Sequence, residues 1–358
     1  MLQRIVLVVA ISSILLPMLF WLWLENAVTQ ALLIPAQGFE LTVARGAGVN
    51  LLADQLVEQN VLKSSLTLKI YARLFSEGDI QAGDYQLPHG TTLPALLTML
   101  TSGAIRHYSI TFPEGWTLSQ WCLTLASTDN IGHTLSESCT MEIVESLGID
   151  YENPEGWFAP NTYAYRSGDS DLSILRRAYQ QMSVELSKLW VERQQGLPYA
   201  TPYEALVMAS IVEKETGVAE ERAQIAGVFV RRLQKDMRLQ TDPTIIYGLG
   251  EQYEGNLTRQ HLQLDTAYNT YLHNGLPPTP IANPGVAALE AALHPASGNE
   301  LFFVARGDGS HYFSTTLDEH NKAVRKYQIT NRPKAYRSLP QQKESAIESP
   351  KMRVLNER

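Results

Sequence analysis

The sequence predicts an α+β fold for this chain of 358 residues, in three parts: an N-terminal transmembrane helix, a small β-α-α-β module and a mixed α+β domain. Three observations lead to this prediction. Residues 5–24 form an uncharged run, a strand–glycine–helix pattern occurs three times before residue 126, and helical and strand-like periods alternate beyond it. The predicted parts are an anchor at 1–25, the module at 38–105, the larger domain at 106–330 and a polar tail at 333–358.

The composition is that of an ordinary globular protein, with 44% hydrophobic and 18% charged residues. The net charge of −8 disfavours a general nucleic-acid binder, which needs a basic face, so we expect no nucleic-acid partner. The eight histidines are scattered and no H-E-x-x-H motif occurs, so we expect no metal and no cofactor. A serine hydrolase is not indicated either, because no G-x-S-x-G motif is present.

The run from Ile5 to Leu24 indicates the compartment. It carries no charge and has about the length that crosses a bilayer. Trp21 and Trp23 stand near its far end, where interfacial aromatic residues belong. Arg4 precedes the run, and NAVTQA beyond it is a poor signal-peptidase site. We therefore expect an uncleaved, single-pass anchor in the inner membrane, with a cytoplasmic N-terminus and the rest of the chain in the periplasm.

A strand–turn–helix unit is repeated in the first third of the chain. Three segments align without gaps: LTVARGAGVNLL from Leu41, YQLPHGTTLPAL from Tyr85 and ITFPEGWTLSQW from Ile110. Each alternates apolar residues, reaches a glycine, and begins a helical pattern three residues later. With a second helix at Ser64–Leu74, the stretch Leu41–Leu87 becomes a β-α-α-β module. Modules of this plan resemble LysM domains, which bind N-acetylglucosamine polymers; a spacer that binds nothing is the alternative.

The remaining segments are predicted from the same periodicities. Helices are expected at Thr140–Leu147, Asp171–Gln195, Val286–Leu293 and Thr316–Tyr327. Met237–Leu239 is expected to be a short strand, and Leu301–Ala305 to pair with His311–Phe313 across a Gly-Asp-Gly turn. The aromatic segment Glu155–Gly168 suits either a sugar-binding cleft or a buried loop that closes a core.

Two cysteines, Cys122 and Cys139, are the only ones in the chain. Two free, partly buried thiols are the common outcome for such isolated residues. In an oxidising compartment they could pair instead, but pairing cannot be read from a sequence. The state of these thiols is therefore left open.

The most unusual stretch is the helix from Pro202 to about Gly217. Its run Ala205–Val212 is apolar except for Ser210, and Glu213 and Glu215 follow directly. At 3.6 residues per turn these carboxyls lie about 200° apart, so they cannot form one carboxylate pair. Bulkier apolar neighbours favour a raised pKa, and hence a general-acid role, for Glu215. Glu213 could pair with a basic residue of the next helix, such as Arg222.

The C-terminal two fifths of the chain carry a set of motifs in a fixed order: VMASIVEKET, ERAQIAGVFVRRL, MRLQTDPTIIYGLG, AYNTYLHNGLPPTPIANPG and HPA. In these motifs the chain resembles the YceG-like endolytic murein transglycosylases, and the resemblance extends over nearly the whole chain. It implies cleavage of the β-1,4 bond between N-acetylmuramic acid and N-acetylglucosamine inside peptidoglycan strands. No water is consumed, and a 1,6-anhydro end is left.

The resemblance also assigns roles to residues. The second glutamate of the E-K-E motif, Glu215, is implied to be catalytic, with Glu213 in support. Residues expected near the substrate are Gln240, Thr241, Asp242, Tyr247, Asn269, Thr270 and Tyr271. Asp242 could instead cap the next helical turn. One carboxyl can suffice, because the C6 hydroxyl of the sugar replaces the second carboxylate of ordinary glycosidases.

Glycan strands and the cytoplasmic membrane are the partners that these features imply. Peptidoglycan synthases (penicillin-binding proteins) are a further expected partner, with a role in ending strand elongation. The alternative from another class is a membrane-anchored glycan-binding or scaffold protein without turnover. The products formed from peptidoglycan distinguish the two.

Overall fold

The computed structural model describes residues 2–75, 78–136 and 138–330, and the side chains from residue 11 onward except Ser12. The predicted tail at 333–358 lies outside this part of the chain. The chain divides into two compact units. Of the described residues, one unit holds those up to Tyr108 together with Ala164–Gly168, and the other holds Ser109–Tyr163 and residues 169–330. The domain bounds expected from the sequence stay predictions.

The chain begins with helix α1, Leu2–Thr29, which contains Pro17. From Ile11 to Trp23 its large apolar side chains are exposed to solvent. Among the residues that the structure describes, no helix is both long and apolar enough to cross a membrane.

The repeated unit of the sequence is present three times as strand, turn and helix. The pairs are β1 (Phe39–Val43) with α2 (Val49–Glu58), β2 (Gly83–Leu87) with α4 (Leu93–Ser102), and β3 (Tyr108–Thr111) with α5 (Leu118–Ala126). In each turn the glycine has a positive φ, +77° at Gly46, +85° at Gly90 and +76° at Gly115. Residues with a Cβ avoid this conformation, which explains the repeated glycine.

In the first unit, α3 (Ser65–Phe75) completes the predicted order β-α-α-β. Strands β1 and β2 pair antiparallel with Leu41 opposite Tyr85. Their inward side chains and those of α2, α3 and α4 form one apolar core, which includes Leu41, Leu52, Leu56, Leu68, Tyr85 and Leu96. The architecture of the module is confirmed, whereas its likeness to LysM domains and its ability to bind glycan are not tested by this.

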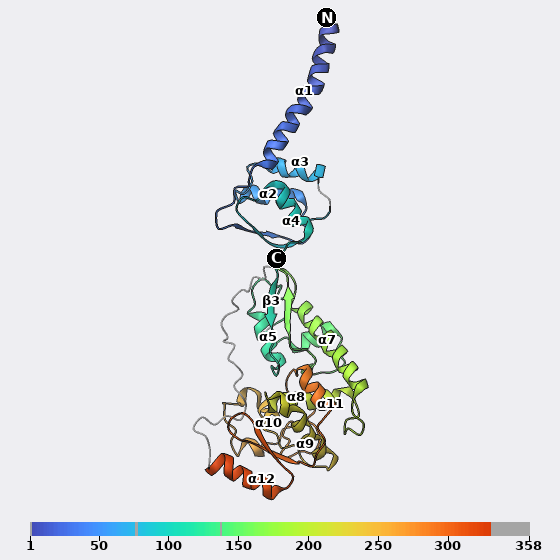
Figure 1. Ribbon diagram of the computed structural model, residues 1–358, viewed down its shortest axis with the longest axis vertical. Coiled ribbons are helices and arrows are strands. Elements are labelled where there is room, and N and C mark those ends of the chain that lie inside the picture. The colour runs from blue at the N-terminus through green and yellow to red at the C-terminus, as the bar shows by residue number, and fades with distance from the viewer. Residues whose placement is uncertain (1, 76–77, 137, 331–358) are drawn as a thin grey trace. The chain divides into compact units, whose positions relative to one another are not determined.

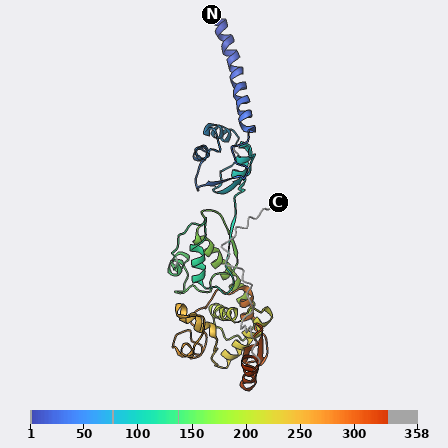
Figure 2. The same ribbon diagram turned by 90° about the vertical axis from the view of Figure 1, so that its left-hand side faces the viewer.

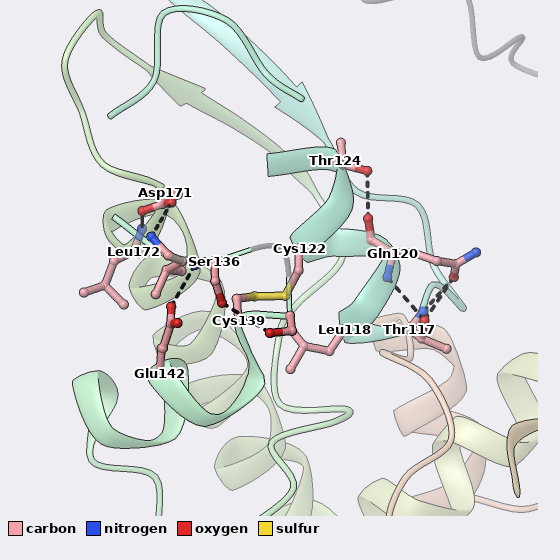
Figure 3. Close-up of a disulfide and its surroundings, with 12 residues drawn as sticks. Thr117, Leu118, Gln120, Cys122, Thr124, Ser136, Cys139, Glu142, Asp171 and Leu172 are labelled. Atoms are coloured by element: carbon pink, nitrogen blue, oxygen red, sulfur yellow. Dashed lines mark hydrogen bonds between the residues drawn. A yellow bond between two sulfur atoms is a disulfide. The ribbon is translucent and has the colours of Figure 1, made fainter. Parts of the chain in front are cut away.

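The second unit opens with a segment closed by a disulfide. Cys122 of α5 and Cys139, directly before α6 (Thr140–Leu147), form this bond, with 6.0 Å between their Cα atoms (Figure 3). Both cysteines are buried. The sequence left the state of these thiols open; the fold brings α5 and the start of α6 within bonding distance, and the two cysteines are paired. Strand β4 (Thr162–Tyr165) pairs with β3.

Most of the second unit is helical. After α5 and α6 come α7 (Asp171–Glu192), α8 (Pro202–Glu215), α9 (Arg222–Gln234), α10 (Asp242–Leu249) and α11 (Val286–Leu293), with the 3-10 turns Ala219–Glu221, Gly250–Gln252 and His261–Gln263. Helix α8 packs against α7, α9, α10 and α11, and Figures 1 and 2 both show α8, α9 and α11 gathered together. Eight consecutive α8 residues, Ala205–Val212, are buried. The central position of α8 explains why it is apolar on every side.

The chain ends in a hairpin and a helix. Strands β5 (Phe302–Ala305) and β6 (His311–Ser314) pair antiparallel, as predicted, and α12 (Leu317–Val324) continues as a π-helix at Arg325–Thr330. The short strand predicted at Met237–Leu239 is wrong. These residues form an irregular segment between α9 and α10. The carbonyl oxygen of Leu239 accepts a hydrogen bond from Nη1 of the buried Arg232 side chain instead of from a neighbouring strand.

Candidate functional site

Helix α8 carries the candidate site at its C-terminal end. Thr201 caps its start, because its Oγ1 accepts the backbone N–H of Glu204 at 3.3 Å, and Pro202 occupies the first turn. The buried run Ala205–Val212 fixes the helix in the core. The E-K-E motif follows where the helix leaves that core, so its three side chains diverge into three different surroundings.

Glu213 and Lys214 hold neighbouring segments of the chain. Glu213 Oε2 accepts the backbone N–H of Gly285 at 3.0 Å, and Lys214 Nζ donates to the carbonyl oxygen of Gly115 at 3.1 Å. Burial raises the pKa of Glu213 and lowers that of Lys214. The expected Glu213–Arg222 pair is wrong, since Arg222 lies against Glu114, with 3.8 Å between Nη2 and Oε2. Glu213 and Lys214 thus fix the loops at Gly285 and Gly115, next to the third residue of the motif, Glu215.

Glu215 points into a cavity. Its Oε1 accepts a hydrogen bond from Thr241 Oγ1. Burial raises the pKa of Glu215 to about 7; the Thr241 hydrogen bond acts in the opposite direction, and the negative charge of Asp242 adds to the rise. A carboxyl with this pKa is partly protonated near neutral pH and can both donate and accept a proton.

The cavity beside Glu215 has a volume of about 770 Å³. Polar groups and aromatic rings both line it, including Lys214, Gln240, Asp242, Tyr253, Asn256, Tyr271, Phe302 and His311. Sugar-binding clefts combine these two kinds of surface, because rings stack on the C–H faces of sugars while polar groups bind hydroxyls. The cavity is large enough for a ligand of more than one sugar ring.

Four of the predicted site residues come together here. Gln240 and Asp242 line the cavity with Glu215, and Tyr271 donates its hydroxyl hydrogen to Asp242 Oδ1 at 2.7 Å. Burial, followed by the charge of Asp242, raises the pKa of Tyr271. Asp242 begins α10 but makes no capping bond there, since Thr241 is the N-cap residue. The capping alternative for Asp242 is therefore wrong.

Thr241 and Thr270 form the layer directly behind the cavity. The backbone N–H of Gln240 donates to the Thr270 carbonyl oxygen at 3.1 Å, and that of Thr241 to Thr270 Oγ1 at 3.1 Å. Both threonines are buried, with 2% and 3% of their surface exposed. They hold the Gln240–Asp242 turn, and only the Thr241 hydroxyl reaches Glu215.

Like Glu213 and the two threonines, the predicted residues Asn269 and Tyr247 are outside the cavity lining. The side chain of Asn269 is buried and donates to the carbonyl oxygens of Leu262 and Leu264 at 3.1 and 2.8 Å. Tyr247 donates to Glu155 Oε2 at 3.3 Å. Both side chains stabilise loops beside the cavity rather than facing it.

Glu155 is the residue that sequence reasoning missed. It is buried, and its carboxylate accepts hydrogen bonds from the Leu118 backbone at 2.9 Å, from Asn283 Nδ2 at 3.2 Å and from Tyr247. Burial raises the pKa of Glu155 to about 7. A signal existed in the sequence, because a charged residue beside Trp157 and Phe158 is costly unless it is paired.

The aromatic segment around Glu155 is a buried loop rather than a cleft. Phe158 and Tyr163 lie in the core, with 0% and 6% of their surface exposed. Trp157 stacks with Tyr151 and Tyr203, at ring-centre distances of 5.4 and 6.1 Å. None of these rings lines the cavity beside Glu215, whose aromatic surface comes from Tyr253, Tyr271, Phe302 and Phe303.

Known proteins share both the sequence and the fold. Residues 41–326 match the YceG-like family. The endolytic murein transglycosylase of Bacillus subtilis is 33% identical over 307 residues, which cover 80% of this chain and 84% of that protein. The endolytic murein transglycosylase of Streptococcus pneumoniae D39 is 27% identical over 79% of this chain and 57% of its own length. The crystal structure of a yceG-like protein from Listeria monocytogenes superposes with a TM-score of 0.52 at 29% identity, over 80% of this chain and 99% of that one.

Proposed function

This chain belongs to the YceG-like family, and from that premise we propose that it is an endolytic murein transglycosylase, as its Bacillus and Streptococcus relatives are named. The substrate is the glycan strand of peptidoglycan, cut at the bond between N-acetylmuramic acid and N-acetylglucosamine. One observation carries the proposal: a glutamate with a pKa of about 7 lies against a large cavity of mixed polar and aromatic lining.

Glu215 acts first as the general acid. Because its pKa is close to neutral, a large fraction of the enzyme holds a proton on this carboxyl when substrate arrives. The proton passes to the glycosidic oxygen, and the bond from that oxygen to the anomeric carbon breaks. Positive charge develops on the sugar ring, and the carboxylate of Asp242 in the same lining stabilises it.

Glu215 then acts as the general base. As a carboxylate it takes the proton of the C6 hydroxyl of the muramic acid, whose oxygen attacks the anomeric carbon and closes the anhydro ring. The proton returns to Glu215, so acid and base are regenerated without water. Thr241 Oγ1 donates to Glu215 Oε1 and so orients the carboxyl in both steps.

Asp242 raises an alternative function, that of a glycoside hydrolase. Two carboxyls beside one cavity are also the equipment of a glycoside hydrolase. The hydroxyl of Tyr271 donates a hydrogen bond to Asp242 Oδ1 at 2.7 Å. This bond favours an electrostatic role for Asp242 over the role of a base that activates water. The products distinguish the lyase from the hydrolase.

We propose further that the protein is anchored in the inner membrane, with both compact units in the periplasm. The uncharged run 5–24 supports an anchor, and the Cys122–Cys139 disulfide suits an oxidising compartment. The β-α-α-β module would bind the glycan strand or act as a spacer. Association with peptidoglycan synthases would let the enzyme end strands during synthesis.

The test is product analysis. The purified full-length chain in detergent is incubated with uncrosslinked glycan strands, and the products are read by mass spectrometry. We expect shorter strands that end in anhydro-muramic acid, each lighter by one water than a hydrolysis product. Reducing muramic ends would show a hydrolase, and uncut strands would favour a binding or scaffold protein.

A further inference from the structure

The segment Arg238–Thr241 contains a strained residue. Gln240 has φ = +52°, in the left-handed region, although it is not a glycine. A Cβ disfavours this conformation, so it persists only where surrounding contacts impose it. The next residue is Thr241, whose hydroxyl donates to Glu215. The backbone turn at Gln240 therefore determines where that hydroxyl lies.

Arg232 of α9 supplies the contacts on one side of this segment. Its Nη1 lies 3.0 Å from the carbonyl oxygens of both Arg238 and Leu239, and 3.3 Å from Gln240 Oε1. Its Nε donates to the Leu301 carbonyl oxygen at 2.6 Å, and its guanidinium carbon lies 5.1 Å from the centre of the Phe302 ring. Only 7% of the Arg232 surface is exposed.

Thr270 supplies the contacts on the other side. It accepts the backbone N–H of Gln240 on its carbonyl oxygen and that of Thr241 on its Oγ1, both at 3.1 Å. Carbonyl groups thus face Arg232 and N–H groups face Thr270. A left-handed residue at 240 satisfies both sets at once.

We propose that Arg232 is a positioning residue for the reaction: its guanidinium holds Gln240 in the left-handed conformation, and this places the Thr241 hydroxyl on Glu215. The inference rests on the proposed role of Glu215 as general acid. Arg232 lines the same cavity, but its donors are directed at the chain itself. It acts through Thr241.

Arg231 is a matched control within the same helix. It is also partly buried and bonds in a similar way, but to a different segment: Nη1 to the Ala296 carbonyl oxygen at 2.9 Å, and Nε to the Glu300 carbonyl oxygen at 2.8 Å. An effect caused only by loss of packing or stability would appear in variants of both arginines. An effect on Glu215 would appear only in variants of Arg232.

The pH profile is the readout that separates these cases. A hydrogen bond donated to a carboxylate lowers its pKa, so losing the Thr241 contact raises the pKa of Glu215 further. The rate falls as this acid loses its proton, so the alkaline limb of kcat/KM must move to higher pH. The titratable groups in the lining with Glu215 are Asp242, Tyr271, Lys214, Arg232, Tyr253, His311 and His320.

The test uses Arg232→Lys, which keeps the charge but replaces the fork by a single nitrogen, so that Leu301 and the segment 238–240 can no longer be bound by separate nitrogens. We expect its alkaline limb to shift upward by about half a pH unit or more, as in Thr241→Val. The Arg232→Lys/Thr241→Val double variant should shift no further than Thr241→Val alone. Arg231→Lys should leave the limb in place. An unshifted limb in Arg232→Lys, or an equal shift in Arg231→Lys, overturns the inference.

A second pair of variants tests the conformation directly. Glycine adopts positive φ without strain, so Gln240→Gly added to Arg232→Lys should return the limb toward that of the wild type. Gln240→Ala added to Arg232→Lys should not, because alanine keeps the Cβ. Equal behaviour of glycine and alanine contradicts the proposed role of the left-handed turn.

A crystal structure of Arg232→Lys tests the positioning role of Arg232 independently of the general-acid role of Glu215. We expect Gln240 to leave the left-handed region and Thr241 Oγ1 to move out of bonding distance of Glu215. If both residues stay in place, the inference fails whatever the activity. If Glu215→Gln remains active, the general-acid proposal fails, while the structural prediction for Arg232 is still decided by the crystal structure.

Discussion

Desolvation raises the pKa of both Glu155 and Glu215 to about 7, but the surroundings of the two carboxyls give them different roles. The carboxylate of Glu155 accepts hydrogen bonds from Leu118, Asn283 and Tyr247, and it lies away from the cavity lining. Among the residues that the structure describes, Thr241 is the donor to Glu215, which faces the cavity. A carboxyl with its acceptor positions filled by the protein holds loops together, whereas one with free positions can exchange a proton with a ligand.

The pKa of Glu155 predicts a dependence of stability on pH. The folded pKa is about 7 and the reference value is 4.5, so between these values the folded state binds more protons than the unfolded state. Stability is therefore lost as pH rises through this window, by about 3 kcal/mol in total for this group. Glu155→Gln does not titrate, and its amide can still accept from Leu118 and donate to Tyr247.

Urea unfolding of Glu155→Gln and wild type at pH 5, 6, 7 and 8 checks this prediction. We expect the unfolding free energy of the wild type to fall more steeply between pH 5 and 7, with the variant gaining relative stability as pH rises. Parallel curves for the two proteins would show that the carboxyl is ionised throughout.

At the scale of elements, the end of α8 is a junction of segments that are distant in the sequence. Glu213 holds Gly285, Lys214 holds Gly115 and Glu215 meets Thr241. Asn283 joins the same junction, since its backbone pairs with Gly115 and Trp116 and its Oδ1 accepts the Phe158 N–H at 3.1 Å. The loop before α11 is thus part of the frame of the site.

A glycine allows that loop to pack closely. Gly156 has φ = +84°, and a Cβ built there would lie 2.5 Å from Pro280 Cβ. Gly196 has φ = +78° but open space around it. Gly156→Ala should therefore destabilise the protein by about 3 kcal/mol, through backbone strain and a clash with the Pro280 ring, and Gly196→Ala by about 1 kcal/mol through strain alone. Chemical denaturation measures both, and equal losses would exclude the clash.

The sequence predicted those elements whose causes are local. The three strand–glycine–helix units, the β-α-α-β order and the β5–β6 hairpin follow from period and turn chemistry, which a short window contains. The strand expected at Met237–Leu239 was wrong because its carbonyl groups are satisfied by Arg232, a side chain rather than a strand. The arrangement around Glu215 was not predictable from periodicity, since α8 is buried on all sides and distant loops decide which carboxyl meets the cavity.

At the scale of the whole molecule, the only two cysteines report on the compartment of the chain. The Cys122–Cys139 bond closes a separation of 17 residues, a loop for which a disulfide contributes about 3 kcal/mol. Such bonds form outside the reducing cytoplasm. The proposed anchor at residues 1–25 and the disulfide therefore predict the same location: the chain beyond the anchor lies in an oxidising compartment.

Thiol labelling tests this prediction. Cells are quenched with acid, the protein is denatured and labelled with a maleimide, and gel mobility is read; denaturation is needed because both cysteines are buried in the folded protein. In the full-length protein we expect neither cysteine to react with a maleimide reagent until a reductant is added. Deleting residues 2–25 should keep the chain in the cytoplasm with two reactive thiols. Reactive thiols in the full-length protein would contradict the periplasmic location, and protected thiols in the deletion variant would show that oxidation does not depend on the anchor.

The central claim is that Glu215 alone among the E-K-E residues transfers the proton. The most direct measurement compares Glu215→Gln with Glu213→Gln by the rate at which anhydro-muramic ends form, with thermal unfolding as the check on folding. The amide has the shape of the carboxyl but cannot donate the proton, so Glu215→Gln should lose at least about three orders of magnitude in rate with its Tm retained. Glu213→Gln keeps an oxygen for the Gly285 N–H and should lose about tenfold or less. Activity retained in Glu215→Gln and lost in Glu213→Gln would contradict the assignment.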